Sequence, residues 1–154
     1  MNTTDNRAVT TLLHLLDVCT DGIEGYRRAA ETIATPKVHR ALAQNAAERE
    51  EVAAILTNLL VELGHPPPHR GTVEGALHRG WLRALGALHK EDAILHECLR
   101  GERATIDAFA QALASELPHD VRTAVQSLLS RVLSALERVD TAATHTAPHT
   151  EVTP

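Results

Sequence analysis

The chain has 154 residues, of which 44% are hydrophobic and only 2% aromatic, and its formal net charge is −5. This length and apolar content suit one folded domain and exclude a fully disordered chain. Acidic and basic residues are interspersed without a basic patch, so we expect no nucleic-acid partner. No apolar stretch approaches membrane-spanning length and no secretion signal opens the sequence, which predicts a cytoplasmic protein without a membrane partner.

The residue types favour helices over sheets. Ala, Leu, Glu and Arg are good helix formers and build most of the chain, whereas the aromatic residues that sheets favour are limited to Tyr26, Trp81 and Phe109. We therefore predict an all-α fold. The two cysteines, Cys19 and Cys98, lie far apart with no metal-binding spacing, and we interpret them as reduced thiols of the core.

Apolar residues spaced by three and four predict a first helix over residues 5–34. Thr35 followed by Pro36 is typical of an N-cap and a first-turn proline, so a second helix should begin there. Gly64 and the prolines at 66–68 should end it. The predicted inward faces of these helices are Leu12, Leu16, Cys19, Ile23, Tyr26, Ala30 and Ile33, then Val38, Leu42, Val52, Leu56, Leu59 and Leu63.

The second half begins with a stretch, His65 to about Lys90, that is too long for a tight turn. Its apolar spacing predicts a short helix over residues 72–88, with Val73, Leu77, Trp81, Ala84 and Leu88 on one side. A third long helix is predicted over residues 91–115, and a fourth from Pro118 to about Asp140. The tail, residues 141–154, is rich in Thr, Pro and His without periodicity and is predicted to be disordered.

Two tight hairpins joined by one long connection are the topology of ferritin-like bundles. The connection must travel about 40 Å, the length of a helix of this size at 1.5 Å per residue, and residues 65–90 suffice for that. An up-down-up-down bundle would need a short middle loop, which is absent. We therefore predict that residues 1–140 form a ferritin-like antiparallel four-helix bundle with a long crossover carrying a short extra helix.

Helical phase bears on whether such a bundle holds metal. Ferritin-like di-iron proteins direct a Glu from each of two helices and a Glu-x-x-His from each of the other two into the core. On helical wheels only Glu102 lies squarely on an apolar face. This argues against a di-iron centre, and we predict no cofactor. A metal-binding alternative, with iron, manganese or zinc, would draw its ligands from Glu24, Glu48, His78, Glu97 and Glu102.

Other polar residues also fall on apolar faces. Arg49 and Asn45 lie on the inward face of the second helix, as Glu102 does on the third, and in the crossover topology these helices run parallel. Arg49 and Glu102 then lie at similar depth, and a buried charge is costly unless paired. We predict a buried Arg49–Glu102 pair with Asn45 as a polar core neighbour.

Several segments together carry a family resemblance. They are the Asp-Gly-x-x-Gly-Tyr motif from residue 21, Ala-Glu-Arg at 47–49, His-Arg-Gly-Trp at 78–81, Glu-Cys-x-Arg-Gly-Glu at 97–102 and Leu-Pro at 117–118. In these the sequence resembles a family of small bacterial four-helix-bundle proteins of unknown function, grouped with the ferritin-like fold. The chain departs from the family pattern at Leu99 and Arg103, where acids are typical, and at Leu136-Glu137, where His-Asp is common. The resemblance implies the fold and an ancestral metal site, but brings no activity.

Two functional hypotheses follow. The first is a non-enzymatic helical bundle that acts through assembly or protein contacts, with a stress response as one setting, and with a homodimer as the favoured assembly. The second is a metal-binding protein or oxidoreductase of di-iron type. The second requires kinks that alter helical phase, for which Gly22, Gly25 and Gly101 are candidates.

Overall fold

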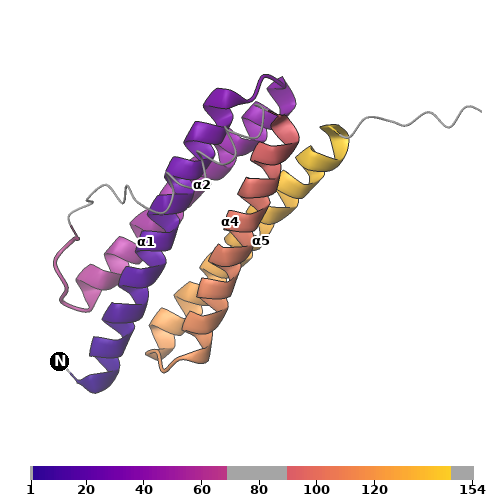
Figure 1. The fold of residues 1–154 in the computed structure, drawn as a ribbon. Coiled ribbons are helices and arrows are strands. Elements are labelled where there is room, and N and C mark those ends of the chain that lie inside the picture. Colours follow the sequence, from indigo (N-terminus) through magenta and orange to yellow (C-terminus); the bar gives the residue numbers. More distant parts are fainter. Residues whose placement is uncertain (1, 69–89, 147–154) are drawn as a thin grey trace, which may run out of the picture.

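The structure is a computed structural model that describes residues 2–68 and 90–146. These residues form four α-helices and no strand: α1 (Thr3–Thr32), α2 (Pro36–Glu62), α4 (Glu91–Ala114) and α5 (His119–Thr146) (Figure 1). The predicted all-α fold with four long helices is confirmed. No helix in these two stretches combines the length and apolar character needed to cross a bilayer. The short helix predicted for residues 72–88 lies outside the described residues.

Local sequence explains where α1 and α2 begin and end. α1 opens with a capping box, in which the Asn2 side chain accepts the Asp5 backbone N–H at 2.9 Å and the Asp5 carboxylate accepts that of Asn2. α2 begins at Pro36, directly after Thr35. It ends just before Gly64, whose φ of 79° lies in the left-handed region that favours glycine. The predicted start and stop of α2 are confirmed.

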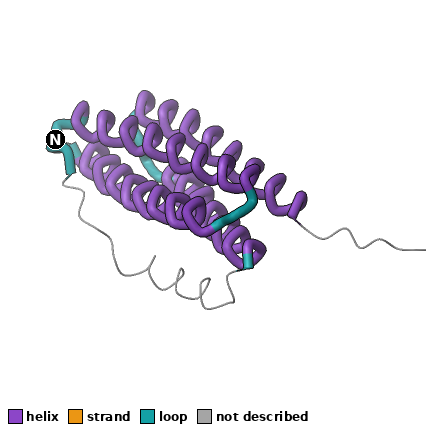
Figure 2. The backbone as a smooth tube through the Cα atoms, turned by 90° about the horizontal axis from the view of Figure 1, so that it is seen from above, coloured by secondary structure: helices purple, strands orange, loops and turns teal. Residues whose placement is uncertain are grey.

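The four helices form a square in which α1 packs against α2 and α4, and α5 packs against the same two helices (Figure 2). At one end, the carboxylate of Glu91 accepts the backbone N–H groups of Ala34 and Thr35 at 3.0 and 2.9 Å, and the Thr35 hydroxyl at 2.6 Å. At the other end, Arg7 near the start of α1 pairs with Glu116, just beyond α4. α4 therefore runs antiparallel to α1 and in the same direction as α2.

The apolar core is divided into two clusters by a polar layer. One cluster holds the first two-thirds of α1, the second half of α2, the C-terminal part of α4 and the N-terminal half of α5, around Phe109. The other holds the C-terminal part of α1, the N-terminal parts of α2 and α4, and the C-terminal part of α5, around Ile94. Along α2 and α4 the residues between the clusters are polar and buried: Asn45, Arg49, Glu102 and Thr105.

α5 differs from the prediction at its C-terminal end. It was expected to end near Asp140 and to give way to a disordered tail from Thr141, but the helix continues through Thr146. Ala142 is buried and belongs to the second apolar cluster, with Ala143 packed against it. These two small residues extend the buried face of α5 by another turn. Their burial stabilises the helix beyond Asp140, where the apolar periodicity of the sequence has ended. Residues 147–154 lie outside the described part.

The contacts of Glu91 generate a stability prediction. The hydrogen bond from the Thr35 hydroxyl, with those from backbone N–H groups, lowers the pKa of Glu91. We expect Glu91→Gln to lower the free energy of unfolding at pH 7 by about 1 kcal/mol. A depressed pKa contributes stability above the unfolded value of about 4.3 and loses it as pH falls through the folded value. Urea unfolding at pH 7 and pH 3 should show the deficit shrinking at the lower pH.

Asp92 provides the control for this experiment. It is the next residue, it is exposed, and it is also acidic and in the first turn of α4. Asp92→Asn should leave the free energy of unfolding nearly unchanged. Equal deficits for the two variants would contradict the assigned role of Glu91 and point to a general effect of charge at the helix N-terminus.

Candidate functional site

The candidate site is a buried polar cluster at mid-height in the bundle, made of Tyr26 from α1, Arg49 from α2, and Glu102 and Thr105 from α4. All four residues are at most 4% exposed. Arg49 pairs through Nη2 with Oε1 of Glu102, and the Tyr26 hydroxyl donates to Oε2 of the same carboxylate. Arg49 Nη1 donates to Thr105 Oγ1 at 3.4 Å, and the Thr105 hydroxyl donates to the carbonyl of Gly101 at 3.0 Å. The structure thus brings Arg49 and Glu102 together.

The electrostatics of the cluster keep Arg49 charged and Tyr26 protonated. Burial would lower the pKa of Arg49, but the adjacent Glu102 carboxylate raises it above the ordinary arginine value, so Arg49 stays a cation. Burial and then the charge of Glu102 raise the pKa of Tyr26, so its phenol stays protonated and remains a hydrogen-bond donor. Both carboxylate oxygens of Glu102 are therefore occupied by donors. In the described residues, no buried side-chain polar atom lacks a hydrogen-bond partner.

Gly22 provides the space for Arg49. A Cβ placed on this glycine would lie 3.1 Å from Arg49 Nη1, closer than side chains normally approach. Gly22 and Tyr26 are four residues apart, so they lie on one face of α1, where Gly22 adjoins Arg49 and Tyr26 bonds to Glu102. Sequence reasoning placed Tyr26 among the apolar core residues and missed its bond to Glu102. The spacing of Gly22 and Tyr26 was the signal available, because a glycine inside a helix needs a packing reason.

Asn45 belongs to a different contact from the buried cluster. Its amide nitrogen donates to the carbonyl of Ala135 at 3.0 Å, and its Oδ1 accepts from Arg138 Nε at 2.7 Å. Arg138 also pairs with Glu48. Asn45 is thus buried in the layer of polar residues, as expected, but it links α2 to α5 rather than touching the Arg49–Glu102 pair.

The acidic residues proposed as metal ligands are distributed over separate contacts. Glu24 pairs with Arg27 on the surface, and Glu97 pairs with Arg100. The other two, Glu48 and Glu102, pair with arginines as described above, and His78 is outside the described residues. Within residues 2–68 and 90–146, no group of three His, Cys, Asp or Glu side chains could hold a metal ion.

The two cysteines are free thiols next to the cluster. Burial raises the pKa of Cys19 to about 11, with Arg49 lowering it in part, and burial and then the Glu102 charge raise that of Cys98 to about 12. The thiolate is the reactive form of cysteine, so neither thiol is a nucleophile at neutral pH. Both thiols are packed in the core, Cys19 in the first apolar cluster and Cys98 in the second.

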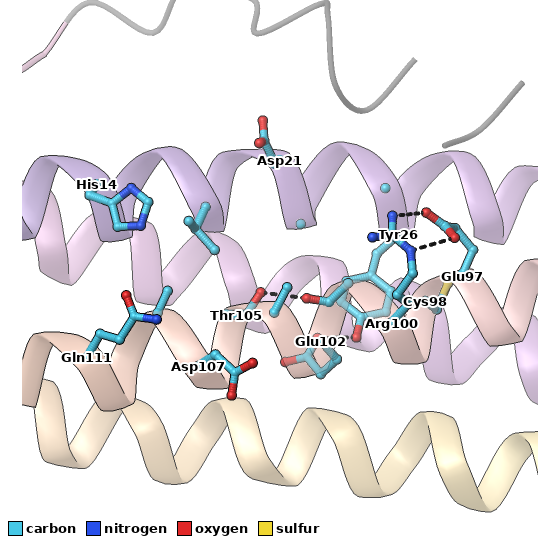
Figure 3. Close-up of a pocket in the computed structure, with 16 residues that line it drawn as sticks. His14, Asp21, Tyr26, Glu97, Cys98, Arg100, Glu102, Thr105, Asp107 and Gln111 are labelled. Carbon is cyan, nitrogen blue, oxygen red and sulfur yellow. Dashed lines mark hydrogen bonds and ion pairs between the residues drawn. The ribbon is translucent and has the colours of Figure 1, made fainter. Parts of the chain in front are cut away.

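A groove of about 550 Å³ lies between α1 and α4, directly outside the cluster (Figure 3). His14 and Gln111 lie at one end and Glu97 and Arg100 at the other, with Asp21 and Asp107 along the sides. Burial and then the charge of Asp17 raise the pKa of Asp21. Much of the lining consists of small residues, namely Gly22, Gly25, Gly101, Ala104 and Ala108.

Over residues 2–68 and 90–146, fold and site define an all-α, four-helix arrangement with a buried ion pair beside a surface groove. Residues 7–115 match the family described as Domain of unknown function (DUF2383), and the chain belongs to that family. The expected membership of a family of unknown function is confirmed. The matched stretch contains every residue of the buried cluster and of the groove. No curated protein matches the sequence.

The buried cluster predicts a strongly non-additive pair of substitutions. Arg49→Met or Glu102→Leu alone leaves the other charge buried and unpaired, which costs about 3–5 kcal/mol. The double variant removes both charges, so its loss should be well below the sum of the two single losses, even though Tyr26 loses its acceptor. Urea unfolding of the four proteins measures the coupling free energy.

A surface pair serves as the control for this cycle. Arg7 and Glu116 are 61% and 72% exposed, and solvent screens such pairs, so their double-mutant cycle should show little coupling. Additive losses for Arg49 and Glu102 would show that the buried pair contributes no more than an exposed one.

The raised thiol pKa values generate a second prediction for this site. At pH 8 the folded protein should react with a chromogenic disulfide reagent far more slowly than in urea, where both cysteines react. A Cys98→Ser variant assigns the remaining reaction to Cys19. Rapid modification of either thiol in the folded protein would contradict their placement as inert core residues.

Proposed function

We propose that this chain is a non-enzymatic helical bundle of ferritin-like layout that acts through protein contacts, and that a second copy of the chain is its first partner. The ferritin-like layout is supported by the helix directions. α2 and α4 run the same way at opposite corners of the square, as expected when one long connection joins two antiparallel hairpins.

The observation that carries the proposal is the buried cluster. Ferritin-like metalloproteins use the middle of the bundle for carboxylates and histidines that bind ions. Here the guanidinium of Arg49 supplies the positive charge at that level, and the carboxylate of Glu102 is fully engaged by Arg49 and Tyr26. A cluster whose donors and acceptors satisfy one another stabilises the bundle and offers no open position to a substrate. This supports a structural role for the interior and a role in contacts for the surface.

The metal-binding alternative makes different demands on the same residues. Glu102 would have to leave both of its partners, and Arg49 would then be an uncompensated buried cation. Glu48 and Glu97 would have to leave their arginines and move to a common point. Since these changes break several existing contacts, the contact-based function is the better supported of the two.

Metal analysis and mass measurement test the proposal together. Untagged protein purified without chelator should hold far less than one iron, manganese or zinc per chain, and light scattering after size exclusion should give about twice the chain mass of 16.7 kDa. Glu102→Ala is the matched variant, because only a specific interior metal would disappear with it. Near-stoichiometric metal that this variant loses would favour the alternative, and a monomer at micromolar concentration would remove the homodimer.

A further inference from the structure

We propose that the outer face formed by α4 and α5 is the surface through which two copies of this chain associate. This inference rests on the proposed function, because it names the face that the second copy covers. Three observations carry it: the apolar side chains of this face, the ion pairs on the other faces of the square, and the charge and size of the face itself.

The α4 half of this face carries three apolar residues spaced by seven. Leu99, Ile106 and Leu113 each follow by two positions a residue that lines the groove with α1. Two positions along an α-helix correspond to about 200° around its axis. The three residues therefore lie on the opposite flank of α4, which faces α5, and all three are only partly buried.

The α5 half is apolar in the same way. Arg131 and Arg138 mark the flank of α5 that contacts α2. Leu129 and Leu133 lie two positions from Arg131, and Leu136 lies two positions from Arg138, so the leucines lie on the flank that faces α4. Leu133 is 42% exposed, and Leu129 and Leu136 are partly buried.

The two halves form one continuous surface. α4 and α5 lie side by side and are joined by the short connection 115–118, so they run antiparallel (Figure 1). Arg122 donates to the carbonyl of Leu113, which sets the register of the pair. Counted from this contact, Ile106 lies at about the level of Leu129, and Leu99 at about the level of Leu136. The apolar side chains thus meet across the two helices.

The other three faces of the square are crossed by ion pairs: Arg27–Glu50 between α1 and α2, Arg131–Glu51 and Arg138–Glu48 between α2 and α5, and Arg7–Glu116 beside α1 and α4. Within residues 2–68 and 90–146, no ion pair joins α4 to α5. Contiguous apolar surface of this kind marks a protein interface, whereas isolated exposed residues need no partner.

The charges of the α4–α5 face suit a second copy of itself. In a two-fold contact the same patch meets from both sides, so a self-complementary patch needs charges of both signs. Arg103 lies four residues after Leu99 and Glu137 four residues after Leu133; both are exposed, and neither forms an ion pair with another described residue. They supply one base and one acid at the rim of an apolar centre.

The groove between α1 and α4 lacks this balance. Three acids line it, Asp21, Glu97 and Asp107, against the single base Arg100, while Glu102 is neutralised by the buried pair. Two copies of this surface would repel each other. The groove is therefore left to other contacts, and the α4–α5 face is the one assigned to the second copy.

The α4–α5 face is also large enough for a stable dimer. α4 has 24 residues and is about 36 Å long. Two adjacent helices, each about 10 Å across, present a face about 20 Å wide, and hence roughly 700 Å². A specific interface buries about 800 Å² on each partner, so this face matches the requirement.

Leu133→Glu tests the assignment, because it places a carboxylate at the most exposed apolar position of the face without touching the buried core. Analytical ultracentrifugation over a concentration series should show the dimer dissociation constant raised about tenfold or more, since each dimer would bury two unpaired charges. Ile55→Glu is the matched control. Ile55 is 36% exposed and lies on α2, so the same substitution there should leave the dissociation constant unchanged.

Arg103→Glu provides a second variant that disturbs no packing, and it decides the question if Leu133→Glu fails to fold by circular dichroism. It leaves acids alone at the rim, so two copies should repel and the dissociation constant should rise several-fold. Adding Glu137→Arg to the same chain restores one charge of each sign and should recover most of the loss.

The remaining outcomes overturn the inference in distinguishable ways. A dimer that withstands Leu133→Glu or Arg103→Glu in a folded chain would place the interface on another face and leave the homodimer itself intact. Equal weakening by Ile55→Glu would reduce the effect to one of added charge and would likewise remove the assignment. A wild-type monomer at micromolar concentration would overturn the homodimer, and this inference with it.

Discussion

The ion pair between Arg49 and Glu102 is the constraint on which the rest of this bundle depends. It joins α2 and α4, which lie at opposite corners of the square, and so it spans the centre of the molecule. A slip of either helix by one turn, about 5.4 Å, would separate the two charges and leave both without compensation in an apolar interior. The pair therefore fixes the register of the two hairpins, which the apolar clusters above and below it could not do by volume alone.

The same constraint shapes α1 and, through it, the surface. The guanidinium passes so close to α1 that a Cβ on Gly22 would lie 3.1 Å from Arg49 Nη1 and would have to displace it. Tyr26, one turn later, donates the second hydrogen bond to the carboxylate. Gly22 and Gly25 of α1 also line the groove, where the absence of side chains leaves space. The groove between α1 and α4 is thus the external counterpart of the buried cluster, and Gly22 belongs to both.

Much of this arrangement was predictable because it depends on periodicity. The inward faces of α1 and α2, apart from the partly buried Leu59 and Leu63, follow from spacing along the chain. So do the proline and glycine that bound α2 and the matching depth of Arg49 and Glu102. What the sequence could not reveal depends on contacts between helices. The phenol of Tyr26 looks like any other core aromatic until its partner is known. The end of α5 is decided by burial of Ala142 against other helices, and a lone alanine carries no such signal.

The extent of the family match sharpens the functional argument. The matched residues, 7–115, include all of α2 and α4 and nearly all of α1, and stop before α5. All members of the buried cluster and all lining residues of the groove come from these three helices, whereas α5 contributes apolar packing and the contacts of Arg131 and Arg138 with α2. The family is therefore defined over the unit that builds the charged centre and the groove. A shared property of its members should be sought in that unit, where the centre fixes the geometry and the groove is the surface left to make contacts.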